Sequence, residues 1–92
     1  MARILAIDDD EDALLYVQSV LSKDHVVMGV NSWIRASEAL IHETFDLILL
    51  DIIMDGISGY DVCVELKRHN STKDTPIIFL TGMTDTESLT RA

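Results

Sequence analysis

Acidic residues directly follow two apolar runs of this sequence. Asp8 and Asp9 come after the run 3–7, and Asp51 comes after the run 46–50. Three carboxylates held close together repel one another, so such a cluster costs stability unless a cation or a proton neutralises it. A hard divalent cation that takes oxygen ligands, Mg²⁺ or Mn²⁺, suits such a set. These residues therefore predict a cation site, provided that the fold brings the two runs together.

The apolar runs themselves predict short buried strands. The runs 3–7 and 46–50 lack the alternation of a half-exposed strand, and such runs are typical of strands covered on both faces. Residues 25–30 are short and rich in β-branched side chains, which favours a strand. Pro76 opens a fourth run, 77–80, where its missing N–H does least harm. We expect four strands.

The segments between these strands carry apolar residues at the spacing of a helix. Ser32 and Asn31 are suitable N-caps for the second helix, and we expect its inward face to carry Ile34, Leu40 and Ile41. The glycine-containing stretch before the third helix is typical of a loop. The expected helices are 12–22, 33–43 and 60–68, and the expected loop is 55–59.

Alternating strands and helices predict a doubly wound α/β fold with a parallel sheet and right-handed crossovers. In such a sheet the first and third strands are neighbours, so Asp8, Asp9 and Asp51 meet at one edge, where ligands bind. Thr81 closes the fourth strand at the same edge. Thr84 and Glu87 then form a capping box that begins a fourth helix.

Three motifs in this order resemble the receiver domain of two-component response regulators. They are the stretches 4–10, 50–60 and 76–82, and the resemblance covers the whole chain. It implies a flavodoxin-like fold with strand order 2-1-3-4. It also implies a phosphorelay function, in which a histidine kinase or a phosphotransfer protein donates a phosphoryl group and an output domain or downstream protein reads the result.

The resemblance also assigns roles to residues. Asp51 matches the aspartate that accepts the phosphoryl group, and a carboxylate is chemically able to act as that nucleophile. Asp8 and Asp9 match the acidic pair at the metal, and the backbone carbonyl of Ile53 matches the third protein ligand. Thr81 matches the hydroxyl that contacts the phosphoryl oxygen. The implied cofactor is Mg²⁺ or Mn²⁺.

Further positions are implied to modulate this chemistry. Gly82 and Met83 belong to the loop that follows Thr81, and Met83 and Ile53 match positions that influence the access of water. Both are apolar, which predicts slow hydrolysis of the acyl phosphate. The resemblance implies a regulatory domain rather than an enzyme, with at most self-catalysed phosphorylation and dephosphorylation.

The chain also departs from the family pattern. The family's invariant lysine and the aromatic switch residue of a fifth strand lie beyond Ala92, and Asp55 stands where the family usually has proline. We therefore expect residues 1–92 to form a single receiver-like domain that is C-terminally incomplete. The fourth strand is then an edge strand, which predicts a homodimer or a strand exchange.

Composition narrows the classes of partner. The chain has 92 residues and a formal net charge of −9, which argues against contact with nucleic acid or an anionic membrane. A single cysteine, Cys63, excludes an intramolecular disulfide. The apolar runs are too short to span a bilayer, so we expect a cytoplasmic location.

Two other functions remain open from the sequence. A phosphorylation-independent docking or dimerisation module could use the same fold. The start 8–10 also fits a haloacid-dehalogenase-type phosphatase, although Glu11 and Asp12 break that motif. Glu11 and Asp12 instead suit the N-terminus of a helix, where acids interact favourably with the helix dipole. Asp10 is compatible either with the pocket or with solvent.

Overall fold

The protein is a parallel sheet between two layers of helices. A computed structural model describes residues 1–51, 53–54 and 57–80. The sheet has the order β2-β1-β3-β6, and all of its strand pairs are parallel. Because β6 is the predicted fourth strand, the expected doubly wound fold and strand order are confirmed. The four strands are β1 (Arg3–Ile7), β2 (Val26–Val30), β3 (Leu47–Asp51) and β6 (Ile77–Leu80).

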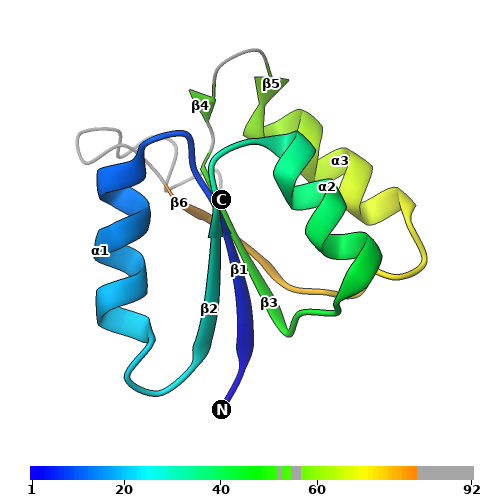
Figure 1. The fold of residues 1–92 in the computed structure, drawn as a ribbon. Helices are drawn as coiled ribbons and strands as arrows, with labels where there is room; N and C mark the ends of the chain where they lie inside the picture. Colours follow the sequence, from blue (N-terminus) through cyan, green and yellow to red (C-terminus); the bar gives the residue numbers. More distant parts are fainter. Residues whose placement is uncertain (52, 55–56, 81–92) are drawn as a thin grey trace.

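Among the described residues, three helices cover the two faces of this sheet. As Figure 1 shows, α1 lies on one face, whereas α2 and α3 lie on the other. Each predicted helix begins and ends within one residue of its expected bounds. The predicted fourth helix, with Thr84 and Glu87, falls outside the described residues. The three helices are α1 (Glu11–Leu21), α2 (Trp33–His42) and α3 (Gly59–Arg68).

A short antiparallel pair lies between β3 and α3. It joins β4 (Ile53–Met54) to β5 (Ile57–Ser58), near the carboxyl end of β3 in Figure 1. The sequence predicted a loop over 55–59, and this prediction is partly wrong because Ile57–Ser58 is a strand. Two-residue strands leave too short a pattern to be recognised in a sequence.

Apolar residues of the central strands alternate between two cores. Leu5 and Ile7 point to the α2 and α3 side, together with Val62 and Leu66 of α3. Ile4 and Ala6 of β1 belong to the smaller core, which also contains Leu14 of α1 and Leu49 of β3. All of these side chains are at least 93% buried. The continuous apolar runs of β1 and β3 follow from this, because helices cover both of their faces.

The inward face of α2 differs from the prediction. Leu40 packs against the larger core as expected, but Ile34 and Ile41 are 71% and 78% exposed. The inward positions are instead Trp33 and Ala36. Trp33, Ala36 and Leu40 form one apolar stripe at helical spacing, and Ile34 and Ile41 form another. The spacing alone does not show which of the two stripes faces the sheet.

The pairing of β1 with β3 begins at a reciprocal contact. The Arg3 amide donates to Asp46 Oδ2 at 2.8 Å, and the Asp46 amide donates to the Arg3 carbonyl at 2.8 Å. This contact joins residues that are 43 positions apart. It fixes the register in which Ile7 pairs with Leu50 at the other end of the strands.

Candidate functional site

The predicted acidic cluster forms at the carboxyl ends of β1 and β3. Asp8 directly follows β1, and Asp51 is the last residue of β3. Ile7 pairs with Leu50, so the next residue of each strand reaches the same edge. One carboxylate oxygen from each of Asp8, Asp9 and Asp51 lies within 4.8 Å of those of the other two. The sequence-based expectation that these three side chains meet therefore agrees with the structure.

Asp8 is the buried member of the cluster. Its side chain is 6% exposed, and its Oδ1 accepts a hydrogen bond from the Asp10 amide at 2.9 Å. Burial raises the pKa of Asp8 above the usual aspartate range, and the nearby Asp9 carboxylate raises it further. The hydrogen bonds from Asp10 and with the Asp51 side chain oppose this increase in the pKa. Asp8 therefore holds a proton more readily than an exposed aspartate does.

The donor chemistry of this cluster fits a hard divalent cation. Asp9 is exposed and Asp51 is half-buried, so the cluster opens to solvent on one side. Three carboxylates supply anionic oxygen ligands, and the open side leaves room for the waters that Mg²⁺ retains. Ile53 begins β4, two residues after Asp51, and its carbonyl remains a predicted ligand.

The other predicted site residues lie beyond the described part of the chain. Leu80, the last residue of β6, pairs with Asp51 across the sheet. Thr81 is the next residue in the sequence, and the modulating positions Gly82 and Met83 follow it. These three residues are outside the described ranges, so their predicted roles stay predictions.

Asp10 has a position that the sequence left undecided. It is the N-cap of α1, with extended backbone angles of φ −91° and ψ 109°, and its side chain accepts hydrogen bonds from the amides of Asp12 and Ala13. Asp at an N-cap is a known preference, so a signal was present. It was hidden because each of the five consecutive residues 8–12 is acidic.

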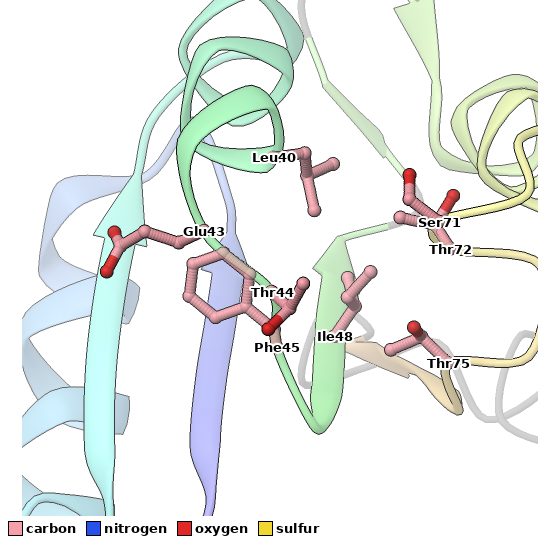
Figure 2. A pocket seen from close by; sticks show the side chains of 8 residues that line it. All are labelled: Leu40, Glu43, Thr44, Phe45, Ile48, Ser71, Thr72 and Thr75. Atoms are coloured by element: carbon pink, nitrogen blue, oxygen red, sulfur yellow. The ribbon is translucent and has the colours of Figure 1, made fainter.

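Cavities also border the described residues away from the acidic cluster. Figure 2 shows a small one, which is lined by Leu40 of α2, Ile48 of β3 and Thr72 from the segment between α3 and β6. Its volume of about 10 Å³ is room for at most one water molecule. A hollow of about 440 Å³ lies between α2 and the end of α3, lined in part by Trp33 and His69. A second hollow of about 440 Å³ borders α1, β2 and Arg35.

The comparisons with known proteins decide the family. The model of the response regulator receiver domain matches residues 4–92. The chain belongs to the response regulator receiver family. Receiver domains are regulatory parts of two-component systems, in which they interact with histidine kinases and output domains. They bind Mg²⁺ at an acidic pocket. The match gives no support to the haloacid-dehalogenase-type alternative.

Individual relatives agree with the family match. This receiver domain is 33% identical over 91 residues to the transcriptional regulatory protein SpaR of Bacillus subtilis, covering 99% of the chain and 40% of SpaR. It resembles the structure of the response regulator TrrA of Thermotoga maritima in complex with Mg²⁺ and BeF, with a TM-score of 0.82 and 30% identity, over 96% of this chain and 76% of TrrA.

A third relative has a closely similar fold. The chemotaxis protein CheY4 of Vibrio cholerae gives a TM-score of 0.87 at 26% identity, covering 98% of this chain and 76% of CheY4. The receiver domain thus spans about two fifths of SpaR and about three quarters of CheY4. No helix in the described part of the chain has the length and apolar character needed to cross a membrane.

Proposed function

We propose that this receiver domain accepts a phosphoryl group on Asp51 from a histidine kinase or a phosphotransfer protein in the cytoplasm. The observation that carries the proposal is the meeting of Asp51 with Asp8 and Asp9 at one sheet edge. Ligands of open parallel sheets bind at the carboxyl ends of the strands, and membership of the receiver family supports a role in phosphorelay signalling.

The proposed transfer requires little covalent chemistry beyond the nucleophile. A carboxylate oxygen of Asp51 attacks phosphorus, the P–N bond of the donor phosphohistidine breaks, and the donor imidazole takes a proton from solvent. Asp8, Asp9 and Asp51 would hold the cation, with the Ile53 carbonyl as a further ligand. A bound Mg²⁺ or Mn²⁺ supplies neutralisation of the phosphoryl charge, which is the main need in such transfers.

Thr81 completes the proposed site. Its hydroxyl contacts a phosphoryl oxygen once Asp51 is modified, and Gly82 and Met83 follow that movement. A local change of charge then biases a two-state element that an output domain or downstream protein reads. Because Asp51 and Leu80 are paired residues of neighbouring strands, a rearrangement after Leu80 begins beside the phosphorylated residue.

The test is phosphorylation of the purified chain by acetyl phosphate with Mg²⁺. We expect intact-mass spectrometry to show the addition of one phosphoryl group, lost on treatment with hydroxylamine. Asp51→Asn removes the addition, whereas Asp24→Asn leaves it unchanged. Asp24 is an exposed residue of the loop between α1 and β2, so it provides a control with the same change of charge.

A docking or dimerisation module is the second candidate, and the exposed apolar surface favours it. Within the described sheet β6 pairs with β3 alone, and Ile78 of β6 is 53% exposed. On α1, Tyr16 and Val20 are 71% and 49% exposed. Exposed apolar patches and unpaired strand edges are commonly covered by another protein surface, and a second copy of this chain is the partner we propose.

Two measurements separate these candidates. Beryllofluoride mimics a phosphoryl group, so its Mg²⁺-dependent binding, abolished by Asp51→Asn, supports phosphoacceptance, whereas a failure to bind favours the module. Light scattering tests the dimer. Ile78→Lys should shift a dimer toward monomer. Ile41→Lys should not, because Ile41 is also exposed and apolar but belongs to α2, which covers the opposite face of the sheet from α1.

A further inference from the structure

One residue joins the first helix to the acidic cluster. The Asp10 side chain accepts hydrogen bonds from the Asp12 amide at 3.0 Å and from the Ala13 amide at 3.4 Å. The Asp10 carbonyl also accepts the Leu14 amide at 3.1 Å, which is the first hydrogen bond of the helical ladder. Asp10 therefore accepts the hydrogen bonds of the first turn of α1, whose amides have no partner earlier in the helix.

The same residue reaches back to the buried carboxylate. The backbone N–H of Asp10 donates to Asp8 Oδ1 at 2.9 Å. On its other side, the Asp8 amide donates to the Val30 carbonyl at 3.1 Å, which extends the ladder between β1 and β2. The backbone of Asp8 is thus fixed by the sheet, and its carboxylate is fixed by the peptide N–H of Asp10 at the start of α1.

We propose that Asp10 is a positioning residue for the cation site. By capping α1, its side chain keeps its own peptide N–H on Asp8 Oδ1, and this contact fixes how the Asp8 carboxylate is presented to Asp9 and Asp51. The inference rests on the proposed cation site. It adds that cation affinity and the first turn of α1 are coupled, and such coupling acts in both directions.

Variants at position 10 separate capping from charge. Asp10→Ala removes both the cap and the charge. Asp10→Asn and Asp10→Ser keep an oxygen that can cap but remove the charge. If positioning is the cause, Asp10→Ala weakens Mg²⁺ binding about fivefold, a factor in the range expected for losing an N-cap, and the Asn and Ser variants restore most of the affinity.

The experiment is calorimetric titration of the full chain with Mg²⁺. Ser32→Ala is the matched control, because Ser32 caps α2 in the same way through the Arg35 amide at 3.2 Å but belongs to a different helix from Asp10. It should lower stability and leave Mg²⁺ affinity unchanged. In the wild type, Mg²⁺ should also slow hydrogen exchange at the Asp12 and Ala13 amides, an effect that Asp10→Ala removes.

Each outcome bears on the inference. Equal Mg²⁺ affinity in Asp10→Ala and Asp10→Ser overturns it, and so does an equal loss of affinity in Ser32→Ala. A loss in Asp10→Asn as large as that in Asp10→Ala makes charge the cause and also overturns it. A wild-type chain that does not bind Mg²⁺ overturns the cation site itself, which is a separate result from unchanged affinity among the variants.

Discussion

Replacing Asp8 by asparagine should stabilise the cation-free protein and abolish its stabilisation by Mg²⁺. Asp8 is 6% exposed, and its carboxylate lies within 4.8 Å of those of Asp9 and Asp51. Asparagine has nearly the same shape, so the Oδ1 contact with the Asp10 amide can persist. The substitution therefore removes the charge of one ligand while leaving the packing of the site largely unchanged.

The magnitude follows from the separation of the charges. Two unit charges 4.8 Å apart repel by about 0.9 kcal/mol in bulk water and by about 3.5 kcal/mol at an effective dielectric constant of 20. Asp8 has two such neighbours, but Asp9 is exposed and screened, and Asp8 and Asp51 share a hydrogen bond that reduces their repulsion. We expect a net gain of about 1–3 kcal/mol in the free energy of unfolding without cation.

The measurement is urea unfolding at neutral pH with and without Mg²⁺. A cation present at a hundred times its dissociation constant stabilises the wild type by about 2.7 kcal/mol. The two curves should therefore cross: Asp8→Asn is the more stable protein without Mg²⁺, and it gains little when Mg²⁺ is added. Asp24→Asn, with the same change of net charge at an exposed position, should respond to Mg²⁺ as the wild type does.

Two results would contradict this reasoning. If Asp8→Asn is less stable than the wild type without cation, the carboxylate is not a source of repulsion. If Asp8→Asn gains as much stability from Mg²⁺ as the wild type, Asp8 is not a ligand.

Four further predictions follow from the structure and the proposed function. In cation-free buffer the free energy of unfolding should rise as the pH falls from neutrality toward the ordinary aspartate pKa of about 3.9. The reason is that the raised pKa of Asp8 makes the folded state bind a proton more tightly than the unfolded state does. Urea unfolding at a series of pH values measures this rise, and Asp8→Asn should flatten it. Tyr60→Phe should stabilise the protein by about 1 kcal/mol in thermal unfolding, since the buried Tyr60 hydroxyl has no hydrogen-bond partner among the described residues; a loss of stability would show that the hydroxyl has a partner in solution. Ser32→Ala should cost about 1 kcal/mol through loss of the α2 N-cap, whereas Ser37→Ala, which removes an exposed hydroxyl bonded to the Ile34 carbonyl, should change stability by less than about 0.5 kcal/mol. Ile53→Asn should shorten the half-life of phosphorylated Asp51, measured by intact mass after removal of the donor, and an unchanged half-life would reject slow hydrolysis through an apolar Ile53.

The sheet and its acidic edge could be predicted because both depend on simple patterns. The predicted strands 3–7 and 77–80 coincide with β1 and β6, since buried parallel strands are nearly continuous apolar runs. Once the sheet is parallel, residues that end neighbouring strands must meet. The sequence alone therefore predicts that Asp8 lies near Asp51.

The remaining details depend on contacts that periodicity does not contain. Isoleucines 34 and 41 have the spacing of a buried stripe, yet α2 turns Trp33 and Ala36 toward the sheet. The choice between these stripes depends on which side chains fill the space above β1 and β3. In the same way, five consecutive acids could not show which one caps α1, because that depends on where the chain leaves the sheet after Asp8.

The contact between Arg3 and Asp46 has a consequence for the order in which this protein folds. It joins residues 43 positions apart, and β1 pairs with β3 only after that long loop has closed. Folds that depend on such non-local pairings form more slowly than local helices do. Asp8 follows β1 and Asp51 ends β3, so a nascent chain with helix α1 already formed still lacks the complete acidic cluster until these strands pair. We therefore expect the site to form late in folding, so that a cation bound there selects chains in which the central strand pair has already formed.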